Sequence, residues 1–131
     1  MSQDTMKQHG VFSWNELMTS DLEAAKAFYG ELLGWTLQDI KSSDMEYCIA
    51  KMGDRQVAGL MTKPKDAKDM PVGWGAYITV DDVDARTRQA QKLGGKIYVE
   101  PRDIPDIGRF SVISDPQGGV VMLITYFGDK M

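Results

Sequence analysis

Side chains able to carry out acid–base, nucleophilic or metal chemistry are scarce in this sequence. It has one histidine, His9, and one cysteine, Cys48. A lone cysteine forms no internal disulfide, a zinc finger needs four Cys or His ligands, and an iron site of two histidines and one carboxylate needs a second histidine. A Cys–His nucleophilic pair requires that the two residues meet. We expect instead that His9 lies at the surface of a polar N-terminal segment and that Cys48 is a buried structural thiol.

Glu16 is the strongest catalytic candidate. It lies in a run with the alternation of a β-strand, where Phe12, Trp14, Glu16 and Met18 share one face. A carboxylate among such neighbours is desolvated, which raises its pKa and suits it to act as a general acid or base. Two alternatives are a solvated carboxylate at a strand edge and an ion pair with an arginine such as Arg109.

The elements that must position these residues follow a repeated order. Residues 11–18 predict a strand, and Ser20 with Glu23 forms a capping-box pattern for a helix over 21–33 that Gly34 ends. Strands are then expected at 35–40, 45–52 and 56–62. After a charged, proline-containing linker at 63–73, the pattern predicts a strand at 74–80 and a helix capped by Asp82. Further strands are expected at 96–100, 109–114 and 120–126, with a long loop over 101–109.

The two halves of the chain correspond to each other. Asp21-Leu22 matches Asp82-Val83, 61 residues later, and Leu33-Gly34 matches Leu93-Gly94, 60 residues later. We therefore expect an α+β protein of two tandem βαβββ modules. Its parts are a flexible segment at 1–10 and one domain at 11–128, made of module one (11–62), the linker (63–73) and module two (74–127).

The composition of the chain indicates which classes of partner are disfavoured and which cellular location to expect. The chain has 131 residues, the size of a single domain, and a net charge of −4, which disfavours nucleic acid and anionic membranes as partners. It has no apolar run long enough to span a bilayer and no signal-peptide core, so a cytoplasmic location is expected.

Several motifs together indicate a family. The run Val11-Phe12-Ser13-Trp14-Asn15-Glu16-Leu17-Met18-Thr19, the pairs Phe28-Tyr29 and Gly34-Trp35, and the turn Asp115-Pro116-Gln117-Gly118 resemble the vicinal oxygen chelate superfamily. This superfamily includes glyoxalase I, bleomycin-resistance proteins and extradiol dioxygenases, and the chain is most similar to its glyoxalase-like "hydroxylase" group. The resemblance implies curved half-barrel sheets around a cavity, and a homodimer.

The resemblance also implies where metal ligands would stand. In metal-dependent members they are His, Gln or Glu on the first and last strand of each module. Carried over to this sequence, the four positions hold Trp14, Gly59, Gly75 and Met122. None of these residues is a usual ligand of such a site, so we expect no metal and no other cofactor, in contrast to glyoxalase I and the iron dioxygenases.

Strand alternation from these positions predicts what lines the cavity. The expected wall is aromatic, methionine-rich and mostly apolar, which is typical of a small-molecule pocket. Arg109, at the end of the expected long loop, either closes over the cavity and binds an anion or forms an exposed salt bridge. Besides Glu16 and Arg109, the candidate ligand-binding residues are Phe12, Trp14, Met18, Met61, Tyr77, Thr79 and Met122.

Three functions are compatible with this predicted cavity lining. The first is binding, with or without turnover, of a small hydrophobic or aromatic metabolite in the absence of a metal. The second is a metal-independent lyase or isomerase that uses Glu16 as acid or base. The third is a resistance protein that sequesters a drug, which for a cationic drug would require more carboxylates than the predicted cavity holds.

Overall fold

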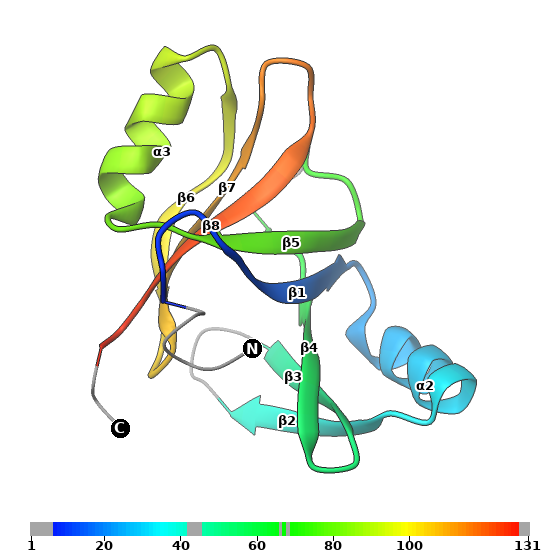
Figure 1. Ribbon diagram of the computed structural model, residues 1–131. Helices are drawn as coiled ribbons and strands as arrows, with labels where there is room; N and C mark the ends of the chain where they lie inside the picture. The colour runs from blue at the N-terminus through cyan, green and yellow to red at the C-terminus, as the bar shows by residue number, and fades with distance from the viewer. Residues whose placement is uncertain (1–6, 42–45, 66, 68, 129–131) are drawn as a thin grey trace. The chain divides into compact units, whose positions relative to one another are not determined.

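The computed structural model describes residues 7–41, 46–65, 67 and 69–128. These residues form two helices and eight strands, which fall into two compact units (Figure 1). The first unit is Trp14–Gly75, and the second is Met1–Ser13 with Ala76–Met131. The boundaries fall inside strands β1 (Phe12–Thr19) and β5 (Gly73–Thr79) rather than in the segment between the modules.

The first unit has the order strand, helix and three strands. After β1 come α2 (Leu22–Leu33), β2 (Thr36–Lys41), β3 (Glu46–Met52) and β4 (Arg55–Thr62). The spatial order is β2-β3-β4-β1. Strands β2, β3 and β4 pair antiparallel, whereas β1 pairs with β4 in parallel.

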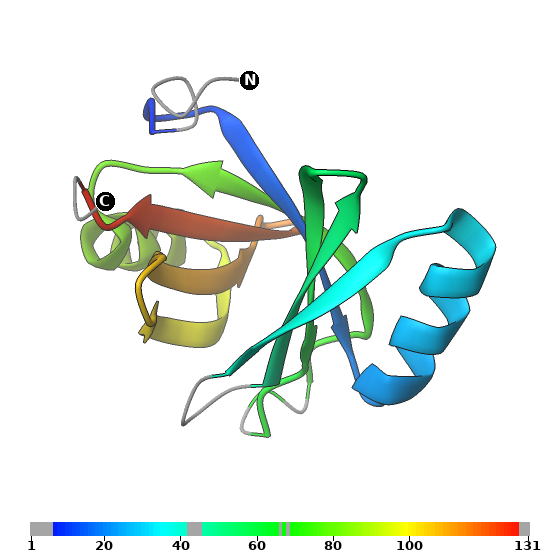
Figure 2. The ribbon, with the colours of Figure 1, turned by 90° about the horizontal axis from the view of Figure 1, so that it is seen from below.

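The second unit repeats this arrangement. β5 is followed by α3 (Val83–Lys92), β6 (Lys96–Ile104), β7 (Gly108–Ser114) and β8 (Val120–Tyr126). The spatial order is β5-β8-β7-β6, again with a parallel first strand, and α3 lies against one face of β6–β8 (Figure 2). The predicted α+β class with two βαβββ repeats is confirmed.

An aspartate caps each helix. Asp21 accepts a hydrogen bond at Oδ1 from the Ala24 N–H at 3.0 Å, and Asp82 does the same for Ala85 at 3.1 Å. Helix α2 therefore begins at Leu22, and the prediction that Ser20 caps it was wrong by one residue. The carboxylate is the better partner here because its charge also interacts favourably with the helix dipole.

The connection before Arg109 is shorter than predicted. Strand β6 continues to Ile104 and β7 starts at Gly108, so the expected loop over 101–109 shrinks to a turn at 105–107. Pro101 interrupts the strand pattern of the sequence, but β6 is the last strand in its order, where a missing N–H is tolerated. The register shifts on both sides of Val99 accommodate the irregularity.

Each unit has an apolar core between its sheet and its helix. In the first unit the core includes Leu17, Leu22, Cys48 and Leu60, and in the second Val80, Val83, Ile113 and Leu123. In the described part of the chain, neither helix is long and apolar enough to cross a membrane.

Candidate functional site

The candidate site of the first unit lies on the sheet face opposite α2. Leu17 points toward α2, so by strand alternation Glu16 and Met18 point to the other face. In the register, Gly59 lies beside Glu16 and Met61 beside Met18. We call this face, made by Trp14, Glu16, Met18, Tyr47, Gly59 and Met61, the helix-free face.

Glu16 is enclosed on this face. Its exposed fraction is 0 %, and among the described residues that are buried it alone belongs to the Asp, Glu, Lys, Arg and His types. Met18, Met61 and Tyr47 beside it are buried too. This burial excludes the alternative of a solvated carboxylate at a strand edge. A charge kept out of water is costly unless its interactions compensate it, and buried carboxylates are therefore concentrated at functional sites.

Tyr47 reaches across β4 and covers Gly59. The Trp14 Nε1–H donates a hydrogen bond to the Tyr47 hydroxyl at 3.1 Å. A Cβ atom on residue 59 would overlap the hydroxyl oxygen of Tyr47 and lie 2.5 Å from its Cζ. Glycine at position 59 is therefore what allows the phenol to lie between β3 and β1.

The residues at the family's metal positions do not fit a metal ion. The indole of Trp14 offers an N–H donor and no lone pair, and the space beside Gly59 is filled by the phenol of Tyr47. Gly75 has no side chain, and the thioether of Met122 is a soft ligand. Within residues 7–41, 46–65, 67 and 69–128, no group of three or more His, Cys, Asp or Glu could hold a metal.

The other predicted lining residues, Phe12, Tyr77, Thr79 and Met122, belong to the second unit, and all of them except Phe12 are buried. Tyr77, Thr79 and Met122 are buried there, Tyr77 beside Met122 in the register. The Tyr77 ring lies 6.2 Å from that of Phe110, a neighbour that the sequence reasoning did not select. Phe12 is 62 % exposed at the start of β1 and is not brought together with these residues.

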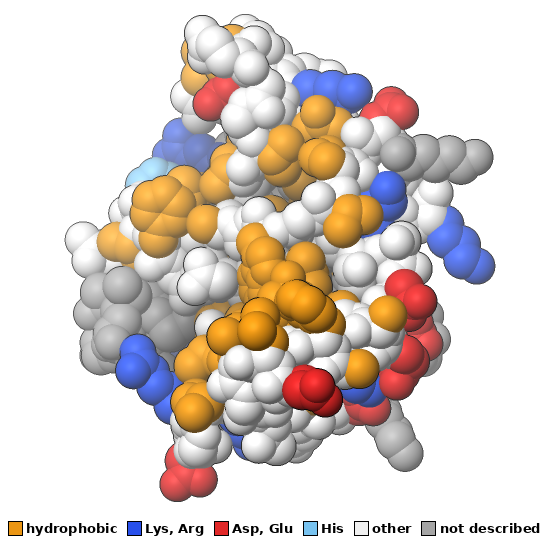
Figure 3. All heavy atoms as spheres, turned by 90° about the vertical axis from the view of Figure 1, so that its right-hand side faces the viewer, with side chains coloured by type: hydrophobic (Ala, Val, Ile, Leu, Met, Phe, Trp, Pro, Cys, Tyr) orange, Lys and Arg blue, Asp and Glu red, His pale blue; other side chains and the backbone are white. Residues whose placement is uncertain are grey.

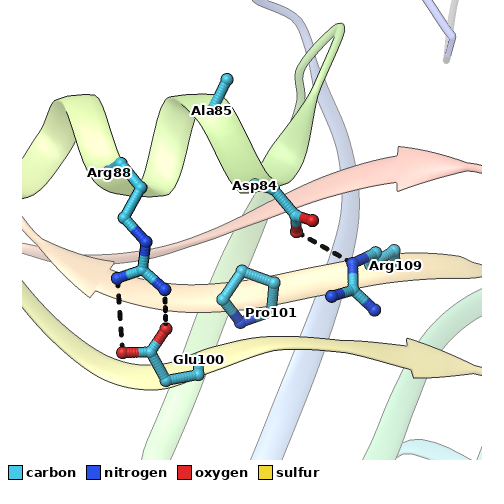
Figure 4. A pocket seen from close by; sticks show the side chains of 6 residues that line it. All are labelled: Asp84, Ala85, Arg88, Glu100, Pro101 and Arg109. Carbon is cyan, nitrogen blue, oxygen red and sulfur yellow. Dashed lines mark hydrogen bonds and ion pairs between the residues drawn. The ribbon is translucent and has the colours of Figure 1, made fainter.

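Arg109 lines a surface pocket of about 420 Å³ in the second unit (Figure 4). Its guanidinium donates to Asp84 at 2.9 Å and to Asp103 at 3.0 Å, and these two bonds raise its pKa. The neighbouring Arg88 pairs with Glu100. Both cations that line the pocket are thus held by carboxylates, which corresponds to the salt-bridge alternative for Arg109 and leaves neither charge free to attract an anion.

His9 and Cys48 have separate surroundings. His9 is half-exposed, and its Nδ1 accepts a hydrogen bond from the Asp81 N–H at 2.9 Å. The next residue, Gly10, donates its N–H to the Thr79 carbonyl at 2.7 Å. The other end of the predicted flexible segment, residues 1–6, lies outside the described residues. Cys48 is in the core on the α2 side, where burial raises the pKa of its thiol.

Tyr47 was the functional candidate that sequence reasoning missed. It stands two residues before Ile49, which lies opposite Gly59 in the β3–β4 register, so its side chain points to the same face as Glu16. The available signal was a glycine inside a predicted strand, because such a glycine marks a close approach by another group.

Comparisons with known proteins agree with this fold. The sequence model of the Glyoxalase/Bleomycin resistance protein/Dioxygenase superfamily matches residues 9–123. CFP32 of Mycobacterium tuberculosis (strain CDC 1551 / Oshkosh), described provisionally as a glyoxylase, is 38 % identical over 120 residues, covering 91 % of this chain and 45 % of CFP32. The anthracycline biosynthesis protein DnrV of Streptomyces peucetius is 30 % identical over 123 residues, covering 83 % of this chain and 44 % of DnrV. The chain thus spans about half the length of these two curated relatives.

Solved structures with the same fold are more distant in sequence. A variant of Streptomyces coelicolor methylmalonyl-CoA epimerase, in complex with 2-nitronate-propionyl-CoA, has a TM-score of 0.61 at 16 % identity, covering 95 % of this chain and 99 % of that one. The hypothetical protein BH1468 of Bacillus halodurans C-125 has a TM-score of 0.60 at 13 % identity, covering 95 % and 99 %. At these identities the likeness concerns the fold alone.

Proposed function

Because this chain belongs to the glyoxalase/bleomycin resistance protein/dioxygenase superfamily, we propose that it binds a small hydrophobic or aromatic metabolite at the helix-free face without a metal ion. This face combines apolar side chains with a few polar groups, as small-molecule sites do. Met18 and Met61 are buried, pliable apolar side chains, and the half-buried Trp14 adds an aromatic ring.

The observation that carries the proposal is the phenol of Tyr47 over Gly59. A metal ligand at position 59 would need the space that the phenol occupies. In its place stand a hydroxyl and an indole N–H, already joined by a hydrogen bond. Groups of this kind orient polar atoms of a ligand by hydrogen bonds, which requires no Lewis acid.

Glu16 supplies the chemistry if the bound metabolite is turned over. A buried carboxylate beside Gly59 can take a proton from a bound ligand and return it to another atom of the same ligand. Such a transfer is an isomerisation, or the first step of an elimination, and requires no oxidant or reductant. The chain would then be a metal-independent isomerase or lyase.

Sequestration without turnover is the second candidate. The name of DnrV associates that relative with anthracycline biosynthesis. The indole of Trp14 and the phenol of Tyr47 give the helix-free face two aromatic side chains, a type that suits an aromatic ligand. The proposal for this chain is the class of ligand, not the role of DnrV.

The experiment is a thermal-shift screen of the purified chain against aromatic metabolites and divalent metals, with elemental analysis of the untreated protein. An excess of an aromatic compound that binds should raise the Tm of the protein, whereas divalent metals should not. Glu16→Gln should retain ligand binding, whereas turnover of any substrate should fall at least about 100-fold. The matched control is Glu31→Gln on the exposed side of α2, which should change neither. Stoichiometric nickel, zinc or iron in the purified protein would contradict the metal-free site.

A further inference from the structure

The two repeated helices present different surfaces to solvent. Hydrophobic side chains gather on the face that carries α2, which is turned toward the viewer in Figure 3, and Phe28 and Leu32 of α2 are exposed. Helix α3 occupies the corresponding position in the second unit, but its exposed side chains include Asp84, Arg88 and Lys92. The repeat therefore carries a charged surface on α3 that the fold itself does not require.

This charged surface contains the pocket of about 420 Å³ shown in Figure 4. Small-molecule sites commonly have volumes of about 300–1,000 Å³, so the pocket is large enough for a metabolite. Helix α3 and the strands β6 and β7 provide its walls. The residues that line it are Asp84, Ala85, Arg88, Glu100, Pro101 and Arg109.

Two ion pairs of opposite polarity stand on either side of Pro101 (Figure 4). In one pair the helix provides the cation, Arg88, and β6 provides the carboxylate, Glu100. In the other pair the helix provides the carboxylate, Asp84, and β7 provides the cation, Arg109. The charges that line the pocket therefore cancel. A simple anion or cation gains no net attraction, whereas a ligand that carries both charges can contact one group of each sign.

The ion pairs leave hydrogen-bonding capacity for such a ligand. A guanidinium has five N–H groups, and a carboxylate has about four lone-pair sites. Arg109 donates from Nε to Asp84 and from Nη1 to Asp103, so its Nη2 donates to none of the residues that the structure describes. The two carboxylate oxygens of Glu100 each accept one bond from Arg88. A ligand can therefore bind to Arg109 and Glu100 without breaking either pair.

The surface between the two pairs is apolar. Pro101 has no N–H, and its ring lies between the pairs in Figure 4. Ala85 adds only a methyl group to the lining. Neither residue competes for the polar groups of a ligand, and both offer carbon surface to an apolar side chain.

We propose that this pocket binds a small zwitterion, an amino acid or a short peptide with an apolar side chain. The ligand carboxylate accepts hydrogen bonds from Arg109, the ammonium donates to Glu100, and the apolar side chain lies on Pro101. Two carboxylates already hold the guanidinium of Arg109 in place, so a ligand does not have to immobilise it. The pocket shares no residue with the helix-free face, so the proposal does not depend on the function proposed for that face.

The test is a nuclear magnetic resonance titration of the ¹⁵N-labelled full chain, which measures both affinity and location. The zwitterionic probes are L-valine and the dipeptide L-valyl-L-valine. At least one should shift the amide signals of Ala85, Glu100 and Arg109 with a Kd on the order of 1 mM, and the tighter of the two identifies the source of the ligand. Isovalerate lacks the ammonium and isobutylamine lacks the carboxylate. Each should bind at least about 10-fold more weakly, because it loses a charge-assisted hydrogen bond.

Variants test the two contacts. Arg109→Gln and Glu100→Gln should each weaken binding of the zwitterion by roughly 10-fold or more, with thermal melting to show that both remain folded. The matched control is Arg86→Gln, which should leave the Kd unchanged. Arg86 is also paired with an aspartate, and its side chain is 38 % exposed against 39 % for Arg109, but it does not line the pocket.

Three results would overturn the proposal. The first is the absence of shifts at these amides with either zwitterion at about 20 mM, well above the expected Kd. The second is binding of isovalerate or isobutylamine as tight as that of the zwitterions. The third is a loss of affinity in Arg86→Gln equal to that in Arg109→Gln, because the effect would then reflect the overall charge of α3 and not the pocket.

Discussion

Replacing Gly59 by alanine tests the packing that defines the helix-free face. The backbone at Gly59 is not among the positive-φ glycines, so alanine is compatible with its conformation. The new Cβ would lie 2.5 Å from the Cζ of Tyr47, overlap its hydroxyl oxygen, and lie 3.1 Å from the Nε1 of Trp14. The phenol must therefore move, and its hydrogen bond with Trp14 is lost.

The cost follows from these contacts. Overpacking in a buried site costs about 1–3 kcal/mol, and a lost hydrogen bond about 1 kcal/mol. Alanine also lowers the conformational entropy of the unfolded chain, which stabilises the folded state by roughly 0.5–1 kcal/mol. The net loss of unfolding free energy should be about 2 kcal/mol, which for a chain of this size lowers Tm by roughly 6–10 °C.

Urea unfolding followed by tryptophan fluorescence measures this loss. The control is Gly30→Ala, inside α2, where the nearest atoms to a new Cβ are 3.7 and 3.8 Å away. That variant should be more stable than the wild type by about 0.5–1 kcal/mol, because alanine is the better helix former. If Gly59→Ala lowers the free energy of unfolding while Gly30→Ala raises it, the loss at residue 59 comes from the contact with the phenol and not from the Gly→Ala change itself.

The reasoning also predicts a coupling between residues 59 and 47. In a Tyr47→Leu background the side chain is too short to overlap a Cβ at residue 59, so Gly59→Ala should then cost less than about 0.5 kcal/mol. If Gly59→Ala costs the same with and without Tyr47, or if it stabilises the wild type, the phenol does not occupy this space.

Three further predictions concern other sites. Thr87, whose buried hydroxyl bonds the Val83 carbonyl at 2.6 Å and meets the Ser111 hydroxyl at 2.7 Å, should lose about 1–3 kcal/mol of stability in urea when changed to valine. The Arg86 guanidinium lowers the pKa of Asp81 to about 2, so the stabilisation from this pair is present above about pH 4 and is lost as the pH falls through 2; Asp81→Asn should flatten the pH dependence of unfolding in that window. The buried thiol of Cys48 should react with a disulfide reagent only at the rate of unfolding.

Patterns within short stretches of sequence were enough to predict most helices and strands and the part of the candidate site that lies on β1. Strand alternation alone placed Glu16 and Met18 on one face of β1, and the register then adds Met61. The repeat was visible because Asp21 and Asp82 both precede a helix and act as its cap. Errors remained where two signals compete over one residue, as for Ser20 beside Asp21.

Contacts between strands could not be predicted in the same way. Tyr47 reaches β1 only because β4 offers no side chain at Gly59, and that depends on the order β3-β4-β1. A long loop was expected over 101–109, with Arg109 at the start of the strand that follows it. Strand β6 instead continues to Ile104, and the bond of Arg109 to Asp103 follows from the pairing of β6 with β7, which local sequence does not reveal.

The parallel strand of the first unit has a consequence for the order in which the unit assembles. The antiparallel run β2-β3-β4 is joined by short connections, whereas β1 pairs with β4 only over Glu16–Thr19 and across about 40 residues of chain. Long-range pairing forms late and opens early, so amide hydrogens of Leu17 and Met18 should exchange faster than those of Ile49 and Ala50. Glu16 lies on β1. Partial detachment of β1 from β4 would therefore give small molecules transient access to the enclosed carboxylate while the antiparallel strands β2, β3 and β4 stay paired.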